Sequence, residues 1–162
     1  MVIVLMGAAG AGKTTVGRHL SDVLQWKFVE GDTLHTPGNI AKMASGTPLT
    51  DDDRQPWLQA LRNVIAASVN ANTDLVLAAS LLTRAYRTTV LAGYERQVKV
   101  IYLRASAALL RERLTTRSDH FAGAALLDSQ LALLDEPTEA LVLNASEAPD
   151  RLVQTIRSAL KV

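Results

Sequence analysis

The chain has 162 residues, of which 48% are hydrophobic, and its 17 Lys+Arg against 16 Asp+Glu leave a net charge of +1. This length fits one domain that buries roughly two-thirds of its unfolded surface, and the apolar content excludes intrinsic disorder. The near-zero net charge argues against a protein that holds nucleic acid through an overall positive field. Because the chain has no cysteine, a disulfide framework, a thiolate metal site and a cysteine nucleophile are excluded.

The sequence carries no sign of a membrane anchor or of a targeting signal. No stretch reaches the ~18 apolar residues that a bilayer span requires. The first apolar run stops at Gly7 and lacks the basic start and cleavage site of a signal peptide. We therefore expect a single soluble, intracellular domain over residues 1–162, bound neither to a membrane nor to nucleic acid.

Five short apolar segments without polar alternation are typical of strands that are covered on both faces. These segments are Val2–Met6, Lys27–Val29, Asp74–Ala78, Val98–Leu103 and Ala140–Leu143. Between them lie longer segments with apolar residues three and four apart, a spacing that predicts helices. Strands that alternate with helices predict an α/β fold with a parallel sheet, which binds ligands at the carboxyl ends of its strands.

Two helix starts have recognisable sequence signals. Pro149 stands where the C-terminal helix is expected to begin. Thr50 and Asp53 resemble a capping pair, although Pro56 leaves the start of that helix open.

The first strand is followed by the phosphate-binding pattern G-x-x-x-x-G-K-[ST], at the junction of a predicted strand and a predicted helix. The matching residues are Gly7, Ala8, Ala9, Gly10, Ala11, Gly12, Lys13 and Thr14. Backbone N–H groups of such a loop can wrap an anion at the positive end of the helix. We expect Lys13 to reach the β- and γ-phosphates and Thr14 to ligate Mg²⁺, with Thr15 also in the nucleotide site. The alternative is a Gly/Ala-rich turn with a chance lysine.

A carboxylate and a histidine follow the second predicted strand. Asp32 stands in Glu30-Gly31-Asp32, at the sheet edge that carries the phosphate loop. Asp32 can accept the proton of an attacking hydroxyl or hold a magnesium-bound water, and the alternative is a solvated carboxylate in a turn. His35 is either a polar loop residue or a donor to a polyol hydroxyl. No second ligand has the spacing of a zinc site.

Arginines are placed in three groups, Arg54, then Arg84 with Arg87, then Arg111, Arg113 and Arg117. Arg113 and Arg117 are four residues apart, so we expect them on one helix face, which His120 continues if the helix extends that far. A shared anion would turn their repulsion into attraction, and the alternative is a solvated basic face. The segment 119–123 is expected to form a mobile lid that excludes water.

Most of the chain resembles the gluconate kinases, small P-loop sugar-acid kinases related to shikimate and nucleoside-monophosphate kinases. The resemblance rests on the phosphate loop, the segment 31–58 with its Asp51-Asp52-Asp53-Arg54-Gln55-Pro56-Trp57, Tyr86-Arg87, the Arg113 and Arg117 pair with His120-Phe121, and Leu127-Asp128-Ser129-Gln130 leading to Asp135-Glu136-Pro137. It implies a five-stranded parallel sheet of order 2-3-1-4-5 with helices on both faces, and a small mobile lid at about residues 117–135.

The resemblance also implies an activity, namely ATP- and Mg²⁺-dependent phosphorylation of the terminal hydroxyl of D-gluconate. Lys13, Asp32 and Arg117 would be catalytic, and Arg113 and Arg117 would contact the nucleotide. The sugar acid would be bound by Asp32, His35, Arg54, Arg87, His120 and Gln130. A cytoplasmic homodimer is a further implication.

The chain departs from the family pattern at two places. Thr83 stands where the family has lysine, with Arg84 beside it, and Ser118 and Asp119 stand where the family has lysine and glycine. Two alternatives to a gluconate kinase therefore stay open at this point. One is a kinase for another sugar acid or a shikimate-like substrate, and the other is a non-catalytic ATP-binding sensor.

Overall fold

The computed structural model describes residues 1–116 and 121–162, including all side chains except those of residues 121–125. Five parallel strands form one sheet in the order β2-β3-β1-β4-β5. The strands are β1 (Val2–Met6), β2 (Lys27–Glu30), β3 (Leu75–Ala78), β4 (Val98–Arg104) and β5 (Leu141–Asn144). The fold class, the strand order and the approximate place of every strand agree with the sequence-based prediction.

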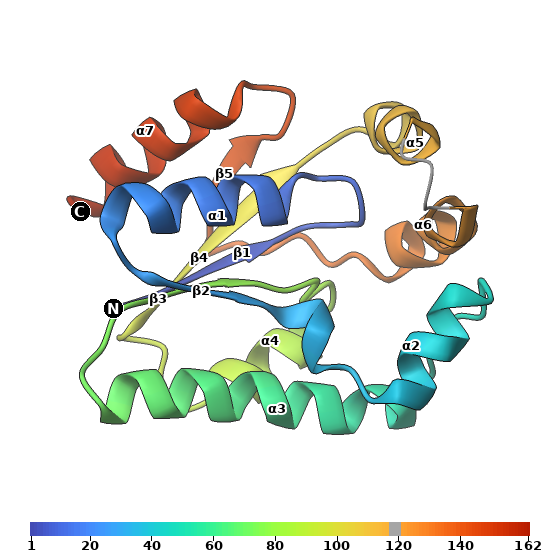
Figure 1. Cartoon of the computed structure of the whole chain (residues 1–162), viewed down its shortest axis with the longest axis horizontal. Helices are drawn as coiled ribbons and strands as arrows, with labels where there is room; N and C mark the ends of the chain where they lie inside the picture. Colours follow the sequence, from blue (N-terminus) through green and yellow to red (C-terminus); the bar gives the residue numbers. More distant parts are fainter. Residues whose placement is uncertain (117–120) are drawn as a thin grey trace.

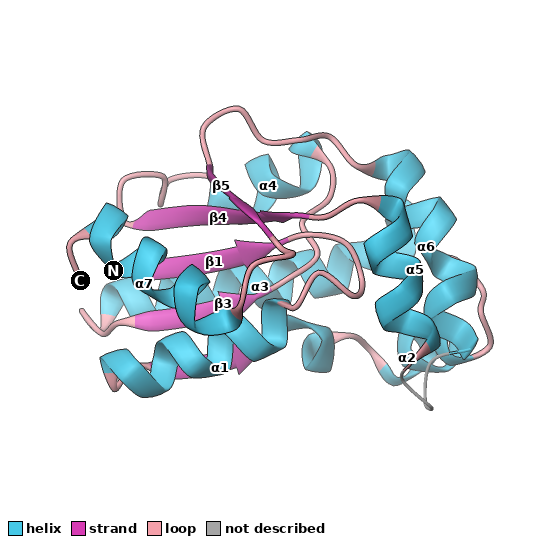
Figure 2. Ribbon diagram, turned by 90° about the horizontal axis from the view of Figure 1, so that it is seen from above, coloured by secondary structure: helices cyan, strands magenta, loops and turns pink. Residues whose placement is uncertain are grey.

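Helices cover both faces of the sheet and gather at one end of it. As Figure 1 shows, α1 (Lys13–Leu24) and α7 (Pro149–Leu160) lie on one face, and α3 (Asp51–Asn70) and α4 (Arg84–Leu91) lie on the other. Beyond the carboxyl ends of the strands lie α2 (Pro37–Ala44), α5 (Ala107–Thr115) and α6 (Phe121–Leu133), whereas both chain termini lie at the opposite end (Figure 2). A 3₁₀ turn, η1 (Gly31–Leu34), connects β2 with α2.

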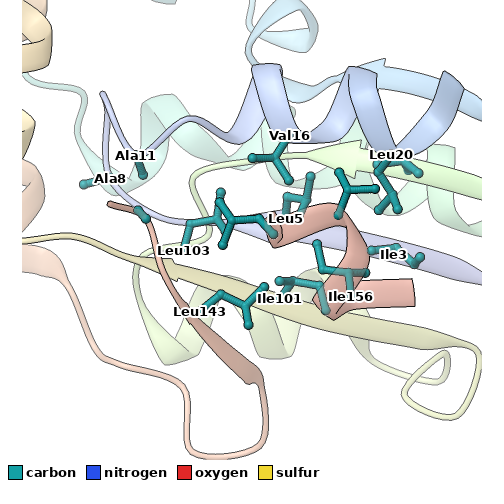
Figure 3. Packing of buried hydrophobic residues seen from close by; sticks show 14 of the residues in the cluster. Ile3, Leu5, Ala8, Ala11, Val16, Leu20, Ile101, Leu103, Leu143 and Ile156 are labelled. Carbon is teal, nitrogen blue, oxygen red and sulfur yellow. The ribbon is translucent and has the colours of Figure 1, made fainter. Parts of the chain in front are cut away.

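The central strand β1 explains why its sequence is apolar without alternation. Ile3 and Leu5 face α1 and α7, in a cluster that extends to Ile156 of α7 (Figure 3). Val2 and Val4 face the opposite side, where they belong to a second cluster around α3 and α4. Because successive side chains of a strand point to opposite faces, a strand covered on both faces needs apolar residues at every position.

The helix starts confirm one prediction and resolve an open one. Pro149 occupies the first turn of α7. At α3 the Thr50 hydroxyl accepts a hydrogen bond from Asp53 N at 3.2 Å, and the Asp53 carboxylate accepts one from Thr50 N at 2.9 Å. This reciprocal capping box starts α3 at Asp51, and Pro56 lies inside the helix.

The helix after β4 is shorter than the sequence suggested. It ends at Thr115 and contains Arg113. The expectation that Arg113 and Arg117 share one helix face stays a prediction, because Arg117 is not among the described residues. Arg117, Ser118, Asp119 and His120 lie outside the described residues.

In the part of the chain that the structure describes, no helix is long and apolar enough to cross a bilayer.

Candidate active site

The phosphate loop joins the carboxyl end of β1 to α1 and owes its shape to glycine. Gly10 and Gly12 have φ angles of 84° and 96°, which lie in the region where side chains are disfavoured. Gly7 has φ 148°, and a Cβ at this position would lie 2.8 Å from the backbone oxygen of Leu103 in β4. The spacing of the motif is thus imposed by backbone geometry and by close packing against the neighbouring strand.

Lys13 and Thr14 begin α1 directly after this loop. Lys13 is only 7% exposed, and its Nζ donates a hydrogen bond to Ala8 O at 3.1 Å, which folds the side chain back over the loop. The Thr14 hydroxyl donates to the Glu30 carboxylate at 2.6 Å. Glu30 was missed by the sequence analysis, which favoured Asp32 from the same segment. The available signal was its place as the last residue of β2, at the edge that carries the loop.

A first cavity of about 110 Å³ opens beside the loop at the carboxyl edge of the sheet. It collects residues from the loop, η1, α2, α3, the segment after β3, α4 and α6. Its lining is Ala9, Lys13, Asp32, His35, Met43, Pro48, Leu49, Arg54, Trp57, Ser80, Leu82, Tyr86, Leu126, Ser129, Gln130 and Leu133. The fold thus brings together six of the predicted site residues, namely Ala9, Lys13, Asp32, His35, Arg54 and Gln130.

His35 is held in the wall of this cavity by Trp57. The two rings stack with centroids 4.6 Å apart and planes inclined by 8°, and Trp57 Nε1 donates a hydrogen bond to Gly31 O at 2.8 Å. Burial lowers the pKa of His35; the nearby Asp32 carboxylate opposes this shift and the Arg54 cation adds to it. The imidazole is therefore neutral at pH 7. Its Nδ1 is buried and makes no hydrogen bond within the described residues.

The two arginines expected to hold a sugar acid have different surroundings. Arg54 lines the first cavity, and its side chain is 16% exposed. Arg87 does not line it. Arg87 Nη1 instead donates to Leu81 O and Leu82 O, both at 3.1 Å, and burial lowers the pKa of the guanidinium. Arg87 thereby supports the segment after β3 that carries Leu82 into the cavity wall.

A second cavity of about 260 Å³ lies against other residues of the same loop, and Arg113 is part of its wall. Its lining is Gly10, Ala11, Gly12, Thr15, Val16, Arg113, Thr116, Ala145, Glu147, Pro149 and Leu152. Arg113 Nη2 donates to Ala145 O at 2.8 Å, and its Nη1 lies 3.4 Å from both Gly10 O and Ala11 O. The phosphate loop therefore contributes to both cavities, with Ala9 and Lys13 in the first and Gly10 to Gly12 in the second.

The lid was predicted at about residues 117–135, and most of this segment is α6, which forms one wall of the first cavity. Gln130 Oε1 accepts a hydrogen bond from the backbone N–H of Ala9 at 2.8 Å, linking α6 to the phosphate loop. Arg111 of α5 pairs with Asp128 of α6 at 2.6 Å. The predicted site residues Arg117 and His120 cannot be placed, because they lie outside the described residues.

The sequence as a whole is similar to those of named gluconokinases. The gluconokinase of Gluconobacter oxydans (strain 621H) is 44% identical over 135 residues, which cover 83% of this chain and 75% of that protein. The thermoresistant gluconokinase of Escherichia coli (strain K12) is 35% identical over 164 residues, 99% of this chain and 93% of that protein. The chain belongs to the gluconokinase family. The family resemblance inferred from the sequence is thus confirmed.

Two further comparisons agree with membership in the gluconokinase family. The crystal structure of a gluconokinase from Sinorhizobium meliloti 1021 matches with a TM-score of 0.87 and 34% identity, over 99% of this chain and 91% of that one. A family model described as an AAA domain matches residues 2–137. The similarity therefore extends from the strand order to the whole tertiary arrangement.

The structure gives a local role to one departure from the gluconokinase pattern. Thr83 is the N-cap of α4, where its hydroxyl accepts a hydrogen bond from Tyr86 N at 3.1 Å. The neighbouring Arg84 is exposed, does not line the first cavity, and donates its backbone N–H to Asp135 Oδ2 at 3.2 Å. The second departure, Ser118 and Asp119, lies outside the described residues.

Proposed function

We propose that this protein is an ATP- and Mg²⁺-dependent gluconokinase that phosphorylates the terminal hydroxyl of D-gluconate to give 6-phosphogluconate. The observation that carries this proposal is that the two cavities share the phosphate loop as part of their walls. One cavity beside it holds the carboxylate of Asp32 and the cation of Arg54, and another holds Arg113. A kinase needs this arrangement, because phosphoryl donor and acceptor must meet at one point. The names of the relatives favour gluconate as the acceptor.

The nucleotide is proposed to bind over the loop, with its base side toward the second cavity. The backbone N–H groups of residues 7–14 and the N-terminus of α1 favour the negative charge of phosphates. Lys13 is proposed to neutralise charge on the β- and γ-phosphates, and Arg113 and Thr15 to contact the nucleotide from the second cavity. Arg117 keeps its predicted role as a catalytic contact from the lid.

The residues next to Lys13 fit a magnesium ion. The Thr14 hydroxyl and the Glu30 carboxylate lie 2.6 Å apart, and oxygen ligands of this kind suit Mg²⁺. Within residues 1–116 and 121–162 no group of three or more His, Cys, Asp or Glu side chains could hold a metal by itself. Phosphate oxygens and water would therefore complete the coordination. The ion supplies positive charge against the β- and γ-phosphate oxygens during transfer.

On the acceptor side, each charged group has a proposed task. Arg54 binds the carboxylate of the sugar acid through charge-assisted hydrogen bonds. Asp32 orients the terminal hydroxyl and accepts its proton as the oxygen forms a bond to the γ-phosphorus and ADP leaves. The neutral His35 and Gln130 bind hydroxyl groups of the substrate. His120 keeps its predicted role as a sugar-acid ligand, whereas Arg87 is proposed to support the wall of the first cavity through Leu81 O and Leu82 O.

An ADP-release assay with a panel of sugar acids tests the proposed function. We expect D-gluconate to be turned over and the uncharged polyol D-glucitol to be a much poorer substrate. Absence of D-gluconate turnover above background would refute the gluconokinase activity, whereas turnover of a different acid would retain only the class of sugar-acid kinases. A thermal shift with Mg-ATP but no turnover of any acid would instead indicate the non-catalytic sensor.

The proposal includes a homodimer in the cytoplasm, as the family resemblance implies. Sedimentation equilibrium across a range of protein concentrations tests the oligomeric state. A single species with the 17.4 kDa mass of one chain would contradict it.

A further inference from the structure

Arg54 is held in place by two side chains, one from its own helix and one from α4. Arg54 Nη1 lies 3.6 Å from Asp51 Oδ1 in α3. The guanidinium carbon lies 5.6 Å from the centre of the Tyr86 ring in α4. The Tyr86 hydroxyl donates a hydrogen bond to the same Asp51 oxygen at 2.5 Å. The three side chains therefore form a closed triad, in which each contacts the other two.

The triad lies at the edge of the first cavity. Tyr86 is buried and Arg54 is half-buried, and both line the cavity, whereas the side chain of Asp51 is 76% exposed. A guanidinium over an aromatic face is attracted by the ring quadrupole, and the nearby carboxylate adds a weaker, solvent-screened attraction. Together the ring and the carboxylate hold a long, flexible side chain in one orientation before any ligand arrives.

We propose that Tyr86 and Asp51 are positioning residues of the sugar-acid site, which act by holding the Arg54 guanidinium ready for the substrate carboxylate. This rests on the proposed function, in which Arg54 is the group that binds the carboxylate. Neither residue needs to touch the reacting atoms. Their loss is therefore expected to raise KM for the sugar acid and to leave kcat and the KM for ATP nearly unchanged.

The chain offers a matched control with the same chemistry. The Tyr102 hydroxyl donates to Glu136 at 3.2 Å, Glu136 pairs with Arg104 at 2.5 Å, and the Arg104 guanidinium lies 5.8 Å from the centre of the Tyr102 ring. None of these three residues lines the first cavity. Substitutions of Tyr102 thus report what the loss of a Tyr–carboxylate–Arg triad does to the protein away from the site.

The first measurement compares substitutions at the two tyrosines. Tyr86→Leu removes ring and hydroxyl, and we expect it to raise KM for D-gluconate by about threefold to tenfold, the range expected when one flexible side chain must be ordered on binding. Tyr86→Phe keeps the ring and is expected to give a smaller rise. Tyr102→Leu and Tyr102→Phe are expected to leave this KM unchanged. Melting temperatures of all variants separate lost stability from lost binding.

A double-mutant cycle with Arg54→Gln decides whether Tyr86 acts through Arg54. In the Arg54→Gln background, Tyr86→Leu is expected to cause no further rise in KM. The same factor in both backgrounds, or no rise in the wild-type background, would overturn the proposal. If Tyr86→Leu does not fold, Asp51→Asn takes its place in the cycle with the same expected outcomes. If Arg54→Gln alone leaves KM unchanged, the carboxylate-binding role of Arg54 fails first, and this proposal with it.

Discussion

Replacement of Gly31 by alanine tests whether close packing behind η1 holds the site together. A Cβ on Gly31 would lie 2.5 Å from the backbone oxygen of Ala78 in β3 and 3.1 Å from Leu61 Cδ2 in α3. A normal contact between such carbon and oxygen atoms is about 3.3 Å, so η1 or β3 must move by about 0.8 Å. Both partners belong to packed elements, and the carbonyl oxygen has no side-chain freedom with which to avoid the clash.

The expected magnitude follows from this displacement. Overpacking of this kind costs about 1–3 kcal/mol. For a chain of this size that corresponds to a fall in Tm of about 2–12 °C, at about 2–4 °C per kcal/mol. Because Asp32 directly follows Gly31, the shift also moves the proposed base, and a misplacement near 1 Å can lower the rate about 100-fold.

Thermal denaturation and steady-state kinetics with D-gluconate measure both effects, with Gly38→Ala as the control. Gly38 lies in the first turn of α2, where the nearest atom to an added Cβ is Thr36 Oγ1 at 4.0 Å. This control is expected to keep its activity and to gain slightly in stability, since alanine favours a helix over glycine. If Gly31→Ala and Gly38→Ala have the same Tm and the same kcat/KM, the close approach at Gly31 does not matter and the reasoning is refuted.

Three further predictions follow from the site. Lys13→Ala and Asp32→Ala are each expected to abolish phosphoryl transfer while the Tm stays near that of the wild type, and a near-normal kcat in Asp32→Ala would remove its proposed role. Burial holds the pKa of His35 below its ordinary 6.5, so the unfolded chain takes up a proton there that the folded chain does not, and the free energy of unfolding should fall as the pH drops below 6.5. Urea denaturation at neutral and at mildly acidic pH should show a smaller fall for His35→Gln, and an equal fall in both proteins would contradict this. Thr50→Ala removes the acceptor for Asp53 N and should destabilise the protein by about 1 kcal/mol in the same denaturation experiment, whereas an unchanged midpoint would show that the cap is dispensable.

Contacts between residues close in sequence were predictable from the chain alone. The phosphate loop could be predicted because its glycines and Lys13 are adjacent in sequence and serve one backbone shape. The start of α3 could be expected from Thr50 and Asp53, since a capping box joins residues three apart, and only the effect of Pro56 needed the structure. The length of a helix was harder to predict from the sequence. For example, α5 ends at Thr115 although no glycine or proline marks its end.

Glu30 shows how the sequence suggested a segment but not the right residue for each role. The segment 30–32 was expected at the sheet edge, and Asp32 does line the first cavity. Which of the two carboxylates lies beside Thr14 depends on how the end of β2 packs against the start of α1. That is a packing relation between two elements, and the sequence does not specify it. The structure gives this place to Glu30.

By itself, the sequence determined the α/β class, the order of the strands along the chain, the phosphate loop and the family, because each depends on residues that are neighbours in the chain or on a long matching segment. Only the tertiary structure decided which distant residues meet. Gln130 reaches Ala9 across 121 positions, and Tyr86 reaches Asp51 across 35. It also separated Arg54, in the cavity wall, from Arg87, which binds backbone carbonyls behind it. Such contacts depend on how helices pack at the end of the sheet, and no local pattern in the sequence encodes that packing.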